Sequence, residues 1–173
     1  MKTKKCFKEY IFESINGFPP VKVVFSDKFL RELHFLTKLP VKSVKQQFTL
    51  SEKQLLRKLE KDLIKYFSGI RANFKKYRIN FSTGTDFQKK VWKAIQTITY
   101  GQTCSYKCLA GKIGNSKSVR AVGNACGKNP LPIIIPCHRI IASNGSLGGY
   151  SAGIDLKMQL LHLERVTYKK PVS

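Results

Sequence analysis

The sequence predicts a two-domain α/β protein, in which a small α+β N-terminal domain (residues 1–80) precedes a mainly helical C-terminal domain (residues 81–173). The first half contains short segments of alternating hydrophobicity, followed by one amphipathic helix. The second half consists mostly of segments with helical periodicity. Between the two patterns, residues 82–85 (Ser-Thr-Gly-Thr) have the composition of a linker.

The N-terminal domain is expected to contain a small antiparallel sheet, because two-residue turn signals separate its alternating segments. The segments are residues 6–15, 21–25 and 29–37, and the turns are Asn16-Gly17 and Ser26-Asp27. A helix follows, for which Ser51 is the expected N-cap and Gly69 the expected end. The residues expected in its apolar stripe are Leu55, Leu56, Leu59, Leu63, Ile64 and Phe67.

The C-terminal domain is expected to begin and end with an amphipathic helix. Thr85 or Asp86 caps the first of these helices, and Gly101 ends it. The last helix covers residues 154–165. The residues expected to face inward are Phe87, Val91, Ala94, Ile95 and Ile98 in the first helix, and Leu156, Leu160, Leu161 and Leu163 in the last.

Two shorter helices between them form a predicted helix-turn-helix. Ser105 caps the first, a turn around residues 111–114 follows, and the second begins near Asn115 or Ser116. Arg120 lies among small residues on the second helix, which would let this helix approach a groove closely. Close helix packing explains the small residues equally well. The residues expected to face inward on the second helix are Val119, Val122 and Ala125.

Cys137 is the candidate nucleophile of the sequence. Residues 133–135 are three isoleucines, which favour a short buried strand because β-branched side chains suit a pleated, packed surface. Pro136 cannot donate a backbone hydrogen bond, so the strand is expected to end there. Cys137 would then lie at the mouth of a rigid strand, with His138 directly beside it.

Two features after the cysteine also point to a site. Residues 142–151 form a polar loop with several glycines, which could wrap a substrate or be an ordinary surface loop. Glu164 lies near the C-terminal end of the last helix, where the helix dipole disfavours an anion. Either a surface salt bridge or a buried partner such as His138 would account for this glutamate.

The charge balance favours nucleic acid as a partner. Thirty-two Lys and Arg against ten Asp and Glu give a formal net charge of +22. Such an imbalance attracts polyanions, because phosphate contacts release condensed counterions. A lysine-rich surface that serves only solubility is the alternative.

The cysteines and the hydropathy favour a cytoplasmic protein. Five cysteines without a signal-peptide pattern suit a reducing compartment with free thiols, and no apolar segment reaches the ~20 residues that a membrane span needs. Cys104 and Cys108 are expected to be small core residues. Neither has a second pair or a histidine at zinc spacing, so no metal is expected.

Several separated blocks resemble one known family, the O6-alkylguanine-DNA alkyltransferases, also called methylated-DNA–protein-cysteine methyltransferases. The similarity runs from about Phe87 to Glu164. The blocks that carry it are Pro-Cys-His-Arg at 136–139, Arg-Ala-Val-Gly-Asn-Ala at 120–125, Asn-Pro-Leu-Pro at 129–132, Ser-Tyr at 105–106, Gly-Gly-Tyr-Ser at 148–151, and Trp92. Residues 1–80 fit the family's variable domain only in size and in the order of strands and helix.

The resemblance implies a single-use DNA-repair protein that binds alkylated double-stranded DNA as a monomer, without a cofactor. It would rotate O6-alkylguanine, with O4-alkylthymine as a second substrate, out of the duplex and move the alkyl group irreversibly to Cys137. By analogy His138 accepts the thiol proton through water, Glu164 orients His138, and Tyr106 protonates the leaving guanine.

The resemblance also implies roles for the remaining residues. Asn129 would connect the recognition helix to the active-site turn, and Arg120 would fill the gap left by the flipped base. The DNA-binding residues would be Arg120, Tyr106, Lys107, Asn115 and Ser143, and the substrate pocket would contain Ile140, Ser143, Tyr150 and Ser151. Only Cys6 and His34 are obvious ligands in the N-terminal half, so the zinc site of some family members is not expected.

Three other functions remain open at this point. A Cys-His hydrolase would share the nucleophile and base, but it leaves the charge and Arg120 unexplained. A binding module that recognises damage and recruits other factors needs no cysteine. A dimeric transcription regulator would make the cysteine incidental.

Overall fold

The computed structural model describes residues 7–39 and 46–169. Contacts within the chain group it into two compact units, unit 1 (Met1–Asn80) and unit 2 (Phe81–Ser173). These units cover the same residues as the two predicted domains, whose functional division stays a prediction. Cys6, a candidate ligand in the sequence, lies outside the described residues. Within these ranges no helix is both long and apolar enough to cross a membrane.

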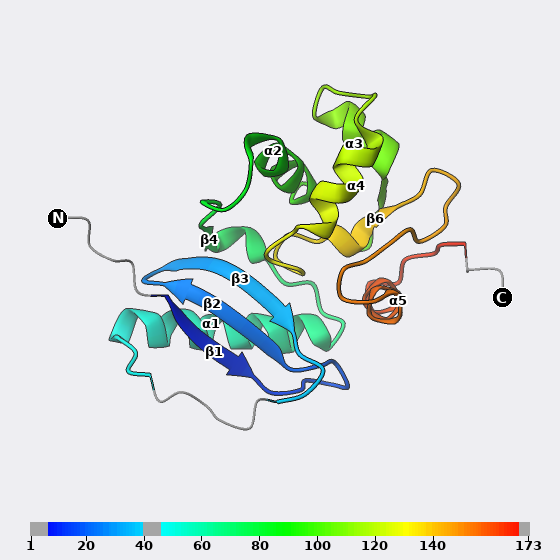
Figure 1. Ribbon diagram of the computed structural model, residues 1–173. Coiled ribbons are helices and arrows are strands. Elements are labelled where there is room, and N and C mark those ends of the chain that lie inside the picture. Colours follow the sequence, from blue (N-terminus) through cyan, green and yellow to red (C-terminus); the bar gives the residue numbers. More distant parts are fainter. Residues whose placement is uncertain (1–6, 40–45, 170–173) are drawn as a thin grey trace. The chain divides into compact units, whose positions relative to one another are not determined.

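A four-stranded sheet in the order β1-β2-β3-β4 forms the framework of unit 1 (Figure 1). Its strands are β1 (Lys8–Phe12), β2 (Val21–Ser26), β3 (Phe29–Phe35) and β4 (Arg78–Ile79). The first three pair antiparallel, as predicted, and Asn16, Gly17 and Asp27 supply the positive φ angles of the two turns. The fourth strand pairs parallel with β3 and was not predicted, because alternation is not detectable over two residues.

Helix α1 (Leu50–Phe67) lies along one face of the sheet in Figure 1. The predicted N-cap, Ser51, is wrong, since Thr49 caps the helix. The Thr49 hydroxyl accepts from the Glu52 amide, and the Glu52 carboxylate accepts from the Thr49 amide at 2.8 Å. This reciprocal arrangement satisfies two backbone donors at once. Gly69 follows the helix with φ +76°, as expected for a residue that ends it.

The apolar stripe of α1 differs from the prediction at two positions, since Leu55 is only half-buried and Ile64 is exposed. Ile64 is 47% exposed, because one further residue turns the helix by about 100° away from Leu63. Tyr66 takes its place and is buried. The apolar side chains that α1 buries are Leu56, Leu59, Leu63, Tyr66 and Phe67.

Unit 2 is mainly helical, with one short parallel strand pair (Figure 1). Its helices are α2 (Asp86–Ile95), α3 (Tyr106–Lys112), α4 (Val119–Gly127) and α5 (Ile154–Leu163), and its strands are β5 (Cys104–Ser105) and β6 (Ile140–Ile141). The predicted caps Thr85 and Ser105 are confirmed: each side chain accepts from the backbone amide three residues later.

Three predicted boundaries in unit 2 are wrong, the smallest difference being at the last helix, which ends at Leu163 and not at residue 165. Helix α2 ends at Ile95 and does not reach Gly101, because the amides of Thr97 and Ile98 bond to carbonyls only three residues back. Helix α4 begins at Val119 and not near Asn115, because the Ser118 amide and hydroxyl both bond to the Asn115 carbonyl in a turn.

Trp92 fixes α2 against α4 in the core of unit 2. Its indole nitrogen donates to the Ala125 carbonyl at 2.8 Å, and both residues are buried. Gly84 allows the close packing of this ring, since a Cβ there would lie 2.4 Å from the Trp92 ring. The orientation of α4, which forms one wall of the candidate site, therefore depends on α2.

Candidate active site

The parallel pair β5–β6 brings Tyr106 and Cys137 together. Cys104 pairs with Ile140, and Ser105 with Ile141. Tyr106 is the first residue of α3, directly after β5, and Cys137 begins a short 3₁₀ helix (Cys137–Arg139) directly before β6. Two segments about thirty residues apart in sequence therefore supply neighbouring walls of one site.

The segment before Cys137 is a buried turn, so the predicted strand at residues 133–135 is wrong. Ile133 has φ +70°, which a β-branched residue rarely adopts, and the Ile135 amide bonds to the Leu131 carbonyl. The prolines at 130, 132 and 136 lack amide donors, so this segment cannot form a regular strand ladder. The isoleucines correctly indicated a buried segment, but a buried segment can be a turn as well as a strand.

Asn129 connects the end of α4 to Cys137. Its side-chain nitrogen donates to the Ile135 carbonyl at 2.7 Å and to the Cys137 sulfur at 2.9 Å. Its side-chain oxygen accepts from the Leu131 amide at 3.0 Å, which fixes the orientation of the amide group. The predicted bridge between α4 and the cysteine turn is therefore present in the structure.

Cys137 opens into a cavity of about 300 Å³. The residues that line it are Tyr106, Gly123, Cys126, Gly127, Cys137, Gly149, Tyr150 and Ser151. Tyr106 packs closely on Gly148, where a Cβ would lie 2.9 Å from its ring. The Tyr150 hydroxyl is buried, and no described residue hydrogen-bonds to it. This hydroxyl is therefore available to a molecule inside the cavity.

Burial holds the Cys137 thiol in its protonated form. It raises the pKa of this thiol to about 11, while the Asn129 hydrogen bond and the positive charge of Lys157 act in the opposite direction. Burial also raises the pKa of Tyr106 to about 12, so the phenol keeps its proton. In the resting protein the site thus holds a thiol and a phenol, and a thiolate forms only if a base accepts the proton.

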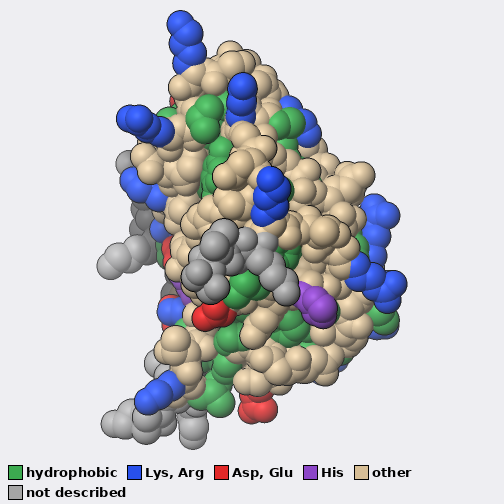
Figure 2. All heavy atoms as spheres, turned by 90° about the vertical axis from the view of Figure 1, so that its right-hand side faces the viewer, with side chains coloured by type: hydrophobic (Ala, Val, Ile, Leu, Met, Phe, Trp, Pro, Cys, Tyr) green, Lys and Arg blue, Asp and Glu red, His purple; other side chains and the backbone are tan. Residues whose placement is uncertain are grey.

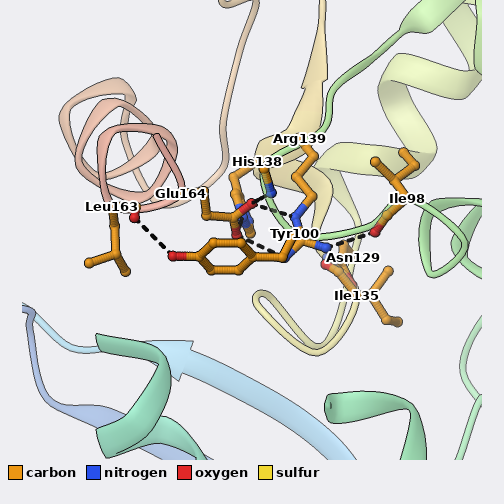
Figure 3. A network of polar contacts seen from close by, with 9 residues as sticks. Ile98, Tyr100, Asn129, Ile135, His138, Arg139, Leu163 and Glu164 are labelled. Carbon is orange, nitrogen blue, oxygen red and sulfur yellow. Dashed lines mark hydrogen bonds and ion pairs between the residues drawn. The ribbon is translucent and has the colours of Figure 1, made fainter. Parts of the chain in front are cut away.

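His138 and Glu164 form a buried pair, which is the second of the two explanations that the sequence left open for Glu164 (Figure 3). His138 Nε2 lies 2.9 Å from Glu164 Oε1. An ionised carboxylate can only accept, so His138 carries its proton on Nε2, and Nδ1 is the ring nitrogen able to accept a proton. Burial lowers the pKa of His138, although Glu164 counteracts this effect.

Arg139 balances the charge of Glu164, a contact that the sequence did not predict (Figure 3). The carboxylate accepts from Arg139 Nε and Nη2, each at 2.8 Å, and from the Gly101 amide at 3.1 Å. Burial acts to raise the pKa of Glu164, but the bonds to His138 and Arg139 outweigh it and hold this pKa well below its usual range. Glu164 therefore stays ionised. Its negative charge raises the pKa of His138, and the positive charge of Arg139 counteracts this effect.

Lys157 is a second residue that sequence reasoning missed. It is fully buried in α5, and its ammonium group donates to the carbonyls of Ile140 at 2.6 Å, Gly149 at 3.3 Å and Leu147. Burial lowers its pKa to about 8. Lys157 thereby ties β6 and the pocket loop to α5 and places a cation near Cys137. The sequence offered one sign of this burial: Lys157 follows Leu156 and precedes Leu160 by three residues, so it lies on the apolar face of the helix.

The predicted DNA-binding residues lie mostly on the surface of unit 2. Arg120, Lys107, Asn115 and Ser143 are exposed, whereas Tyr106 lines the cavity. Of the predicted pocket residues, Tyr150 and Ser151 line it and Ser143 does not. Ile140 also lies outside the lining, being fully buried in β6. On the face drawn in Figure 2, Lys and Arg side chains are widely spread and acidic ones are few.

The described cysteines other than Cys137 differ in their burial. Cys104 is buried as expected, but Cys108 is exposed, which corrects its assignment to the core. Cys126 lines the cavity with Cys137, and burial raises its pKa to about 12. His34 bonds to Glu32, and residues 7–39 and 46–169 contain no group of three or more potential metal ligands.

Known proteins share both the sequence and the fold. Residues 86–166 match the family described as 6-O-methylguanine DNA methyltransferase, DNA binding domain. A methylated-DNA–protein-cysteine methyltransferase of Methanosarcina barkeri is 41% identical over 155 residues, which cover 89% of this chain and 94% of the relative. This chain belongs to the methylated-DNA–protein-cysteine methyltransferase family.

Further relatives support membership of the methylated-DNA–protein-cysteine methyltransferase family. The Kluyveromyces lactis protein of that name is 36% identical over 94% of this chain and 88% of its own. The crystal structure of Mycobacterium tuberculosis OGT in complex with DNA superposes with a TM-score of 0.76 at 35% identity, covering 91% of this chain and 92% of that one. The similarity thus includes unit 1, where the sequence offered only size and element order.

Proposed function

We propose that this protein repairs DNA by moving the alkyl group of O6-alkylguanine, and of O4-alkylthymine, to its own Cys137. The observation that carries the proposal is the cavity in which the Cys137 sulfur lies 2.9 Å from Asn129 Nδ2, next to the His138–Glu164 pair. The relatives named above support the same activity. The reaction is irreversible, because ordinary thiol chemistry does not cleave a thioether, so each molecule acts once.

The proposed transfer moves one alkyl group and one proton. The sulfur forms a bond to the alkyl carbon while the bond between that carbon and guanine O6 breaks. His138 accepts the thiol proton through water, and Tyr106 donates a proton to the leaving guanine. Proton return from His138 to Tyr106 through solvent then completes the balance: the thiol hydrogen ends on guanine, and the alkyl group ends on sulfur.

Three groups of this chain favour the thiolate at the moment of transfer. Asn129 donates a hydrogen bond to the sulfur, and Lys157 supplies a nearby positive charge. His138 accepts the proton on Nδ1, while the bond to Glu164 holds its ring in place. The alkylated base would fill the cavity, where the buried Tyr150 hydroxyl offers it a hydrogen bond.

The proposed binding of DNA uses α3 and α4 as a helix-turn-helix in a C-terminal DNA-binding and alkyl-transfer domain, residues 81–173. Exposed Arg120 would enter the base stack after the alkylated nucleotide rotates out, and Lys107, Asn115 and Ser143 would contact the duplex. The crystal structure of the Mycobacterium tuberculosis relative in complex with DNA supports a DNA partner. The protein would act as a monomer in the cytoplasm.

Intact mass after incubation with a duplex containing O6-methylguanine tests this function. The expected result is a gain of one methyl group per protein, which a duplex with unmodified guanine does not produce. Cys137→Ala should bind the duplex as tightly as wild type and gain no mass. Release of a product by multiple turnover would instead indicate a hydrolase, and binding without any mass gain would indicate a recognition module.

A further inference from the structure

Unit 1 carries more than half of the positive charge of the chain, although it lies outside the matched DNA-binding region. Residues 1–80 contain 19 Lys and Arg and 7 Asp and Glu, so their formal net charge is 19 − 7 = +12 of the total +22. The family match that describes DNA binding covers only residues 86–166. The contacts proposed for unit 2 therefore leave the charge of unit 1 without a partner.

A cavity of about 240 Å³ in unit 1 gathers four of these basic side chains. Lys28 comes from the β2–β3 turn, Lys58 from α1, Lys76 from a 3₁₀ helix, and Arg78 from β4. The remaining lining residues are Ser51, Gln54, Leu55 and Tyr77. No acidic side chain is among them, and Leu55 and the Tyr77 ring are its apolar members.

Most of the charge around this cavity is uncompensated. Lys76 Nζ pairs with Asp62 at 2.6 Å, and the same carboxylate accepts from the Tyr77 hydroxyl. No ion pair within the described part of the chain involves Lys28, Lys58 or Arg78. Three cations around one hollow repel one another, and an anion inside it would remove that repulsion.

The lining also contains donors that suit phosphate oxygens. Ser51, Gln54 and Lys58 recur at intervals of three and four residues, so α1 presents a hydroxyl, an amide and an ammonium group on one face. Across the cavity Arg78 supplies a planar guanidinium, which can bond two oxygens of one phosphate.

We propose that the basic cavity of unit 1 binds a backbone phosphate of nucleic acid, as a second anchoring site apart from residues 86–166. The inference rests on the proposed function only for the identity of the polyanion, since the cavity itself specifies a phosphate-like anion. Inorganic phosphate offers the same oxygens without the polymer. The two sources are separate arms of the test.

Two variants with equal loss of charge provide that test. The cavity variant is Lys28→Gln/Lys58→Gln/Arg78→Gln, and the matched control is Lys53→Gln/Arg57→Gln/Lys61→Gln, whose residues are exposed on α1 outside the cavity. The Kd for an undamaged duplex is measured at several salt concentrations. The cavity variant should weaken binding several-fold more than the control, and its salt slope should fall by about 0.9 for the lost phosphate contact.

Equal losses in the two variants would overturn the proposal, because general charge would then explain the binding. A different outcome would overturn the assignment to nucleic acid. In it, only the cavity variant loses the thermal stabilisation by inorganic phosphate, while the cavity and control variants bind the duplex with equal affinity. If a triple variant does not fold, Lys58→Gln and Lys61→Gln form the matched single pair. Methyl transfer from free O6-methylguanine is recorded throughout, so a failure of the proposed function is seen separately from a failure of this site.

Discussion

Arg139 forms a bidentate ion pair with Glu164, in which its Nε and Nη2 atoms each lie 2.8 Å from a carboxylate oxygen. The same carboxylate bonds to His138, and all three residues are buried. Arg139 also donates to the Ile98 carbonyl at 2.7 Å, which anchors it to the segment after α2 (Figure 3). His138 is thus held by a carboxylate whose charge is balanced by Arg139, and not by an isolated anion.

Removing Arg139 should therefore destabilise the fold strongly. Arg139→Gln leaves the buried Glu164 carboxylate without its cation, and losses of this kind amount to roughly 3–5 kcal/mol. Arg139→Lys keeps a charge but cannot form both bonds, so its loss should be intermediate. Urea unfolding of the two variants, with the exposed Arg165→Gln as control, measures the difference. A stability of Arg139→Gln equal to that of wild type would show that the pair contributes nothing.

Stability should fall in two stages as the pH is lowered from 8 to 4. His138 has a pKa below its ordinary 6.5 when folded, so the unfolded chain takes up this proton first and stability falls below about pH 6.5. Glu164 has a pKa below its ordinary 4.5, so its contribution is lost as the pH falls further. Urea unfolding as a function of pH measures both stages. The variant His138→Asn should remove the first stage. The control variant His162→Asn, at an exposed position, should leave it unchanged.

Replacing Lys157 should disturb the pocket loop and the transfer reaction together. Lys157→Met leaves the carbonyls of Ile140, Leu147 and Gly149 without this donor, the first two of them buried, and should cost on the order of 1–3 kcal/mol. It also removes the cation near Cys137, so the thiol pKa should rise above its present value of about 11. The pH dependence of Cys137 alkylation by iodoacetamide reports this shift. Lys128→Met, at an exposed position, should change neither quantity.

Arg120→Ala should slow transfer from duplex DNA far more than transfer from the free base. Arg120 is exposed on α4 and outside the cavity lining, so it can act on the duplex without touching the bound base. The free base needs no flipping and bypasses that role. Rates on both substrates at fixed salt, with Lys117→Ala as control, decide the matter. Equal losses on both would mean that Arg120 supports the fold or the pocket.

Local features of the sequence predicted much of this structure. Helix caps and turns depend on residues that are close together in the chain, so the local sequence is sufficient to find them. Those found in this way are the caps Thr85 and Ser105, the turn at Asn16-Gly17 and the helix end at Gly69. Glu164 could be paired with His138 because an anion at a helix C-terminus is unfavourable unless a partner compensates it.

Contacts between distant segments were harder to predict. Arg139 and Lys157 bond to carbonyls and a carboxylate far away in sequence, and nothing in their own neighbourhood specifies these partners. The isoleucines at 133–135 show the same limit, since an apolar run indicates burial without indicating the backbone conformation. The resemblance to the alkyltransferases supplied the roles of Tyr106 and Asn129, which residue patterns alone would not have given.

In the proposed reaction Cys137 accepts the alkyl group, and Cys126, the other thiol of the cavity, does not. Cys126 lines the same cavity, but only Cys137 accepts a hydrogen bond from Asn129 and adjoins His138. Peptide mapping after reaction with a duplex containing O6-methylguanine distinguishes the two cysteines. The methyl group should lie on Cys137 alone, with Cys126→Ala still reactive and Cys137→Ala inert. Methyl found on Cys126, or on Cys104 or Cys108, would contradict the account.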